Sequence, residues 1–160
     1  MNVYDFDKTI YDGDSTVDFF LYVLKRKPTL IRYIPRQVFG FFLYFIRKID
    51  KTRLKEYFFC FLKEINAIDL VEDFWTLNED KIVNWYLRQQ KVDDIVISAS
   101  PEFLLLPICQ RINIKNLIAS NVDYLTGKFS GKNCYGEEKL HRLNEIYNEP
   151  HIDNLYTDSE

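Results

Sequence analysis

The sequence predicts an α/β protein, in which a Rossmann-like and mostly parallel sheet core carries an inserted all-helical segment. Four short apolar runs support this fold class, at residues 3–4, 95–97, 117–119 and 155–156. Continuous runs of aliphatic and β-branched residues are typical of parallel strands that are covered on both faces. Residues 15–90, between the first two runs, show helix-start patterns instead. The helical segment is therefore expected to follow the first strand directly.

The helices of this segment are predicted from capping residues and apolar spacing. Ser15, with Asp18 three residues later, resembles a capping box, and Asp50 and Asp69 are suited to begin later helices. The stretch from residue 39 to 46 has no charged or amide side chain, so its helix is apolar nearly all round. We expect helices over residues 15–25, 36–48, 50–62 and from 69 onward.

The second half of the chain alternates predicted strands with predicted helices. Residues 95–97 are all β-branched, and Ser100 followed by Pro101 is a strong helix start, because Ser caps a helix and Pro suits its first turn. A hairpin-like turn is expected at residues 126–128, and a further helix at 136–147. This alternation is the pattern of parallel strands joined by crossover helices.

Charge and aromatic residues are distributed unevenly along the chain. The net charge is −3, but residues 25–63 carry 11 Lys and Arg against 2 acids, which is +9 and leaves −12 for the remainder. Thirteen of the 26 aromatic residues lie between residues 19 and 61. Such a shift favours an inserted module. We therefore divide the chain into a core, 1–14 with 91–160, and a helical insertion, 15–90.

Composition excludes several classes of protein. Gly and Pro number only 5 each, which excludes a collagen-like chain, and no apolar run approaches the 18 residues of a membrane-spanning helix. Three widely spaced cysteines without a C-x-x-C pair favour reduced thiols, and the first residues lack a signal-peptide pattern, so a cytoplasmic location is expected. Nucleic acid is not an expected partner of an acidic chain.

Polar side chains suited to phosphate chemistry follow three of the predicted strands. Asp5 and Asp7 follow the first strand, Ser98 ends the second, and Asp158 follows the last. Ligands of such sheets bind outside the carboxyl ends of the strands, where these residues are expected to meet. Lys139, on the predicted helix 136–147, is placed to reach the same edge.

Taken in order, these residues resemble the four motifs of the haloacid dehalogenase (HAD) superfamily: Asp5-x-Asp7-x-Thr9, then Ser98, then Lys139, then Asp158-Ser159. The helical insertion resembles the cap of the phosphoserine-phosphatase-like branch, and the resemblance spans nearly the whole chain. It implies a magnesium-dependent phosphomonoester hydrolase that acts on a small phosphorylated metabolite.

The resemblance also implies a role for each acid. Asp5 is the implied nucleophile, forming an aspartyl-phosphate and dividing hydrolysis into two easier steps. Asp7 is the implied general acid for the leaving alkoxide and later the general base for water. Mg²⁺, which prefers oxygen ligands, is expected on the Asp5 carboxylate, the Asp7 carbonyl and Asp158. Dehalogenases of the superfamily lack the second acid and its ion-pumping ATPases carry Thr there, so Asp7 favours a phosphatase.

Hydroxyl, amine and main-chain N–H groups are expected to hold the phosphate. Ser98 supplies a hydroxyl and Lys139 a positive charge, although Lys132 also lies in range and stays an alternative to Lys139. The main-chain N–H groups of Phe6 and Ala99 are further donors. The full expected set of phosphate-binding residues is Phe6, Thr9, Ser98, Ala99 and Lys139.

One departure from the family concerns the fourth motif, which in the family continues to a second acid two positions beyond Glu160. We therefore expect the C-terminal part of the core to be missing, magnesium to bind more weakly, and the exposed sheet edge to favour self-association. Two alternatives stay open. One is a catalytically weak or inactive domain that binds phosphate or a partner. The other is a phosphatase acting on a membrane-surface or polyanionic phosphate, with peripheral membrane contact through the basic, aromatic insertion.

Overall fold

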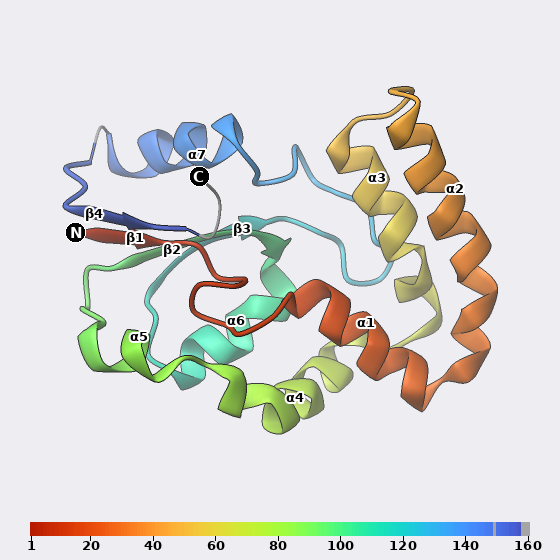
Figure 1. The fold of residues 1–160 in the computed structure, drawn as a ribbon, viewed down its shortest axis with the longest axis horizontal. Coiled ribbons are helices and arrows are strands. Elements are labelled where there is room, and N and C mark those ends of the chain that lie inside the picture. Colours follow the sequence, from red (N-terminus) through yellow and green to blue (C-terminus); the bar gives the residue numbers. More distant parts are fainter. Residues whose placement is uncertain (149, 158–160) are drawn as a thin grey trace.

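At the centre of the computed structural model, which describes residues 1–148 and 150–157, is a four-stranded parallel sheet in the order β3-β2-β1-β4. Its strands are β1 (Asn2–Tyr4), β2 (Ile95–Pro101), β3 (Asn116–Ser120) and β4 (Asn154–Tyr156). Val3 of β1 lies opposite Ile95 on one side and Leu155 on the other. All four strands therefore end at the same edge, and the predicted α/β fold is confirmed (Figure 1).

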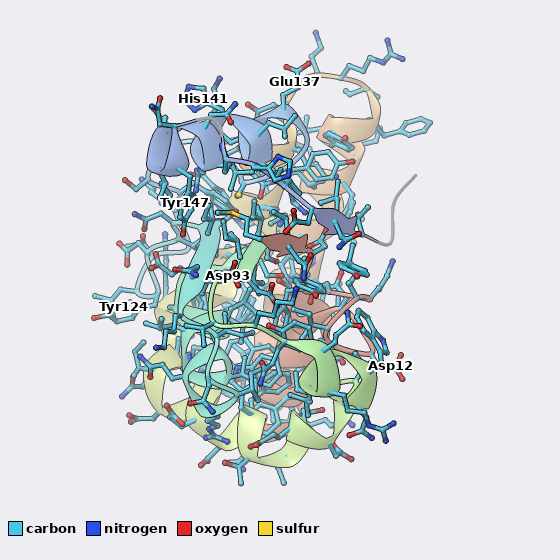
Figure 2. The ribbon with its side chains drawn as sticks, turned by 90° about the vertical axis from the view of Figure 1, so that its left-hand side faces the viewer. Asp12, Asp93, Tyr124, Glu137, His141 and Tyr147 are labelled. Atoms are coloured by element: carbon cyan, nitrogen blue, oxygen red, sulfur yellow. The ribbon has the colours of Figure 1, made fainter. Side chains whose placement is uncertain are left out.

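Helices cover both faces of the sheet (Figure 1). Tyr4 and Val96 face an aromatic-rich core that includes Trp75, whereas Val3 faces the opposite side and packs with Leu143. This division follows from the alternation of side chains along a strand. The first face is covered by α1 (Ser15–Arg26), α4 (Ala67–Asn78), α5 (Asn84–Gln89) and α6 (Glu102–Arg111), and the second by α7 (Glu137–Tyr147). Figure 2 shows His141 on the outward side of α7 and Tyr147 on its side toward the sheet.

Between α1 and α4 the chain forms a helical hairpin beyond the carboxyl edge of the sheet (Figure 1). Its elements are η1 (Pro28–Tyr33), α2 (Ile34–Phe45), α3 (Lys51–Phe58) and η2 (Phe59–Glu64), and η3 (Glu79–Lys81) follows α4. α4 lies outside this hairpin and packs on α6, where Trp75 Nε1 donates to the Leu104 carbonyl at 2.6 Å. Every regular element within residues 15–90 is helical, as predicted.

Two serines that resemble helix caps make different contacts. The cap of α1 is Asp14, whose carboxylate accepts a main-chain hydrogen bond at 3.0 Å, so the prediction of Ser15 as the cap is wrong. Pro101, and not Ser100, occupies the N-cap position of α6. The Ser15 hydroxyl donates to Ser100 Oγ and the Ser100 hydroxyl donates to Asp7, so both side chains are engaged away from the helix ends.

The helix boundaries in the hairpin also differ from the prediction. α2 ends three residues early, because Arg47 adopts a left-handed φ of 57° that no helix continues through. α3 begins after the predicted cap Asp50, but the chain tightens to a 3₁₀ helix before residue 62. α4 begins after Asn66, so the predicted start at Asp69 is wrong. Asp69 lies in the first turn, where its charge complements the helix dipole.

The later predicted elements are found close to their expected positions. α7 corresponds to the predicted helix at 136–147. The predicted turn at 126–128 contains Gly127 at φ 73°, and an antiparallel bridge pairs Val122 with Phe129 across it. Among the helices described, none is long and apolar enough to span a bilayer.

Candidate active site

The chain turns sharply after β1 and leaves Asp5 at the carboxyl edge of the sheet. The Asp5 N–H donates to the Tyr156 carbonyl at 2.8 Å, which extends the pairing of β1 with β4 by one residue. The Phe6 side chain is buried, and its carbonyl accepts the N–H groups of Ile10 and Tyr11 at 2.9 Å each. The turn is thus fixed by its own backbone, which holds the Asp5 carboxylate in place.

Asp5 forms a close ion pair with Lys139. Lys139 Nζ lies 2.5 Å from Asp5 Oδ2, and the two side chains are only 23% and 16% exposed, so water screens their charges weakly. Lys139 stands in the first turn of α7, after Gly136 at φ 59°. Lys132 is exposed, and its main-chain carbonyl accepts a hydrogen bond from the Arg142 guanidinium. Of the two candidate lysines, Lys139 is the one that contacts Asp5.

The second acid, Asp7, is partly buried and accepts two hydrogen bonds. Ser100 Oγ donates to its Oδ2 at 2.5 Å, and the Ser15 N–H donates to its Oδ1 at 2.7 Å. Burial raises the pKa of the Asp7 carboxyl above its usual range, although these hydrogen bonds oppose the rise. A carboxyl in this environment holds a proton more readily than an exposed one, as a general acid must.

A cluster of buried hydroxyls surrounds Asp7. Ser15 Oγ donates to Ser100 Oγ at 3.2 Å, and Thr16 Oγ1 lies 2.9 Å from the same Ser100 oxygen. Sequence reasoning missed this cluster, because Ser15 and Ser100 also fit helix-cap patterns. The spacing of Ser98 and Ser100 was an available indication, since residues two apart in an extended segment project to one side.

The end of β2 holds the predicted Ser98 and Ala99. Ser98 is fully buried and its Oγ accepts from the Ser100 N–H at 3.1 Å, while the Ala99 carbonyl accepts from Ser120 Oγ at 3.0 Å. The Phe6 N–H, predicted as a phosphate donor, donates here to Asp5 Oδ1 at 2.8 Å. Thr9 is buried in the turn after β1.

Among the described residues, no hydrogen bond joins the Thr9 side chain to Asp5 or Ser98. Thr9 is therefore not joined to these two predicted site residues by its side chain. Side-chain hydrogen bonds join Asp5 to Lys139 and Asp7 to Ser100. These two pairs form the centre of the candidate site.

A lysine from α3, Lys55, also reaches this edge and was not singled out from the sequence. Its Nζ donates to the Ala99 carbonyl at 2.6 Å. Burial lowers the pKa of the Lys55 ammonium to about 8, although the carboxylates of Asp7 and Asp14 oppose the shift. The structure therefore adds a second cation at the edge where Asp5 and Lys139 meet.

The other contacts of α3 show why Lys55 points inward. The Asn133 N–H donates to Thr52 Oγ1 at 3.0 Å, and the Phe129 N–H donates to Glu56 Oε1 at 3.1 Å. Positions 52, 55 and 56 share one face of a helix, which is the sequence pattern that could have identified this face. One side of α3 is thus polar, and it is fixed to the loops beyond the sheet.

The acids at the end of β1 fit the ligand chemistry of magnesium. Both offer carboxylate or carbonyl oxygens, which Mg²⁺ prefers over nitrogen or sulfur. The third predicted ligand, Asp158, lies outside the described residues. Within residues 1–148 and 150–157, no three acids, histidines or cysteines converge as a metal site.

Comparisons with known proteins agree with this architecture. A protein of unknown function from Bordetella pertussis Tohama I has a similar fold, with a TM-score of 0.70 at 17% identity over 95% of this chain and 75% of that chain. A phosphoserine phosphohydrolase-like protein from Francisella tularensis subsp. tularensis SCHU S4 is also similar, with a TM-score of 0.58 at 14% identity over 98% of this chain and 77% of that chain. No curated protein matches in sequence.

The family comparison covers nearly the whole molecule. The haloacid dehalogenase-like hydrolase family matches residues 3–160, which include the turn after β1, the end of β2 and the first turn of α7. The chain therefore belongs to the haloacid dehalogenase-like hydrolase family.

Proposed function

We propose that the protein is a magnesium-dependent phosphomonoester hydrolase that works through an aspartyl-phosphate on Asp5. The observation that carries this proposal is the position of the Asp5 carboxylate, beside the Lys139 ammonium and two residues before the partly buried Asp7. A phosphate dianion repels an attacking carboxylate, so a nucleophile of this kind needs positive charge nearby. Lys139 supplies that charge.

In the first step, an oxygen of Asp5 attacks the phosphorus and the ester oxygen leaves. Asp7 donates its proton to that leaving oxygen, and the raised pKa of its carboxyl suits it to carry one. Lys139 and the N–H groups at the end of β2 hold the equatorial oxygens of the phosphoryl group. The product alcohol departs and the phosphoryl group remains on Asp5.

In the second step, Asp7 removes a proton from water, which then attacks the phosphorus of the aspartyl-phosphate. Inorganic phosphate leaves and Asp5 is restored. The Ser100 hydroxyl and the Ser15 N–H keep the Asp7 carboxylate oriented through both proton transfers. Asp7 therefore acts first as an acid and then as a base.

Magnesium would be held by the Asp5 carboxylate, the Asp7 carbonyl and Asp158. When bound, it neutralises negative charge on the phosphate and on the attacking carboxylate. Residues Asp5 and Asp7 supply oxygen donors of the required kind.

The substrate class we propose is a small phosphorylated metabolite with additional negative charge. Lys55 lies at the same edge as Lys139 and adds a cation that the reacting phosphate does not require. The fold similarity to a phosphoserine phosphohydrolase-like protein supports phosphomonoester chemistry. The three cysteines are free and buried, which suits the reducing cytoplasm that we propose as the compartment.

Hydrolysis of a panel of phosphomonoesters, with magnesium and after chelation, tests the function. Asp5→Asn should reduce turnover by several orders of magnitude, because the amide is a far weaker nucleophile. Asp12→Asn is the matched control, because Asp12 is an exposed acid in the same turn (Figure 2). A wild-type protein that binds phosphate but hydrolyses no ester of the panel would instead be the inactive binding domain.

A further inference from the structure

The outward side of α2 is apolar and exposed. We call this side the α2 outer face. Phe45 is 85% exposed, the largest value among the exposed hydrophobic side chains of this helix. The α2 outer face consists of Val38, Phe39, Phe41, Phe42, Phe45 and Ile46, each at least two-fifths exposed. A helix that is apolar on all sides is normally buried, and an exposed patch of this kind marks a surface that another body covers.

The fold leaves this face open because α2 is attached through its other side. Gln37 Nε2 donates to the Phe58 carbonyl at 2.9 Å, and Gly40 approaches Tyr57 so closely that a Cβ there would lie 2.4 Å from the Tyr57 Cβ. Figure 1 shows α3 between α2 and the rest of the molecule. The aromatic side chains of the α2 outer face therefore contribute little to the core.

Cations adjoin these aromatic side chains. An open groove of about 870 Å³ at the C-terminal end of α2 is lined by Phe41, Tyr44, Phe45, Arg47, Lys48, Ile49 and Asp50. Its acid, Asp50, accepts the Arg53 N–H at 2.7 Å as the cap of α3. No ion pair joins Arg47 or Lys48 to a carboxylate in the part of the chain that is described. The groove thus combines aromatic walls with two cations and one carboxylate, a net charge of +1.

The charge of the surrounding segment narrows the choice of occupant. Residues 25–63 carry +9 and the remainder carries −12. A second copy that presented the same face would bring another basic surface against the first, and the like charges would repel. An anionic bilayer offers both complements, because phospholipid headgroups attract Lys and Arg and the acyl boundary accepts aromatic rings.

We propose that the α2 outer face, with Arg47 and Lys48, binds the surface of anionic phospholipid bilayers. Phe42 and Phe45 enter the headgroup and acyl boundary, and the two cations contact lipid phosphates. This is peripheral binding by one face of a short helix. It does not rest on the proposed phosphatase activity, because it uses none of the residues at the carboxyl edge of the sheet.

Co-sedimentation with vesicles tests the proposal. Wild-type protein should bind vesicles of mixed phosphatidylglycerol and phosphatidylcholine more tightly than vesicles of phosphatidylcholine alone, and added salt should weaken the binding. Phe42→Gln with Phe45→Gln should reduce the affinity by about 10- to 100-fold, since two large apolar side chains no longer leave water. Leu140→Gln with Ile146→Gln on α7 is the matched control, because those side chains are each 59% exposed and lie on another surface.

Arg47→Gln with Lys48→Gln separates charge from apolar contact, and should reduce binding to the anionic vesicles alone. Far-UV circular dichroism verifies folding, and Phe45→Gln alone replaces the double variant if that fails to fold. Wild-type protein that ignores both kinds of vesicle, or equal binding by the Phe42→Gln/Phe45→Gln variant, would overturn the proposal. Concentration-dependent mass that this variant abolishes, without vesicle binding, would assign the face to a second copy and also overturn it.

Discussion

The two helices of the hairpin, α2 and α3, have opposite relations between polarity and burial. α3 is rich in charged residues, yet its inner side is fixed to the sheet edge by hydrogen bonds of Lys55, Thr52 and Glu56. α2 carries almost no charge along its length, yet most of its apolar side chains face outward. A short loop joins them, so connectivity does not explain the difference.

This difference shows where a surface is built for something other than folding. Folding alone would bury the phenylalanines of α2 and expose the charges of α3, because charged groups lose hydration when buried. Buried charge and exposed aromatic side chains are therefore the informative departures. The inner side of α3 points to the chemistry at Asp5 and Asp7, and the outer side of α2 points to a partner.

The comparison predicts that changes at the carboxyl edge of the sheet, which the inner side of α3 contacts, alter turnover and leave vesicle binding intact. The largest graded effect is expected for Asp7→Asn, which removes the acid and base but keeps the shape of the side chain. Turnover of alkyl phosphates should fall by about 100- to 10,000-fold, and that of aryl phosphates by less, because an aryl oxide leaves without a proton. Steady-state rates on both ester types measure this. Equal losses would remove Asp7 from the proton-transfer role.

A somewhat smaller effect is expected for Lys139→Met. The variant keeps an unbranched side chain of similar length but removes the charge beside Asp5, so turnover should fall by about 100- to 1,000-fold. Lys132→Met is the matched control on the exposed alternative, and should retain wild-type turnover. The reverse result, with Lys132→Met the damaged variant, would exchange the roles of the two lysines.

Lys55 tests the link between α3 and the site through the pH profile. Its ammonium is charged below a pKa of about 8, so catalytic efficiency on polyanionic substrates should fall as pH rises through that value. Lys55→Gln should lower efficiency by about tenfold at pH 7 and remove this decline. Lys55→Arg should keep efficiency and move the decline to higher pH, because arginine stays charged. Identical profiles for all three proteins would make Lys55 purely structural.

The same lysine makes an opposite prediction for stability. Its pKa is lower in the folded protein than the ordinary 10.5, so between pH 8 and 10.5 the unfolded chain binds more protons. The contribution of Lys55 to the free energy of unfolding should therefore rise with pH across this window, so the wild type should gain stability relative to Lys55→Gln as pH rises. Urea unfolding at several pH values measures it, and parallel curves for the two proteins would contradict the assignment.

The smallest expected effect concerns the contact between the two helices. Gly40→Ala forces a Cβ against Tyr57, and we expect a net loss of about 1 kcal/mol, because overpacking costs about 1–3 kcal/mol and alanine regains about 1 kcal/mol of helix propensity. Val38→Ala, at an exposed position of the same helix, is the control. Thermal unfolding measures the loss of stability. An unchanged midpoint temperature for Gly40→Ala would show that α2 moves away from Tyr57 of α3 without cost.

Much of the fold was predictable, because each strand contains a short apolar run and the segment between the first two runs shows helix-start patterns instead. The predicted helix starts were wrong where one local pattern fits both a helix cap and a residue that contacts a distant side chain. Ser15 and Ser100 look like caps, yet both donate to Asp7, and only the meeting of distant segments reveals this. Lys55 was hidden for a related reason. Eleven cations lie within residues 25–63, and the docking of α3 selects the one that turns inward.

The central claim is that Asp5 carries the phosphoryl group, and trapping the phosphoenzyme tests it most directly. Wild-type protein mixed with a rapidly hydrolysed ester and quenched in acid should carry a phosphoryl group on the peptide that contains Asp5, identified by mass spectrometry. Asp5→Asn should carry none, whereas Asp12→Asn should match the wild type. Continued turnover without a phosphoenzyme, or a phosphoryl group on any other residue, would contradict covalent catalysis by Asp5.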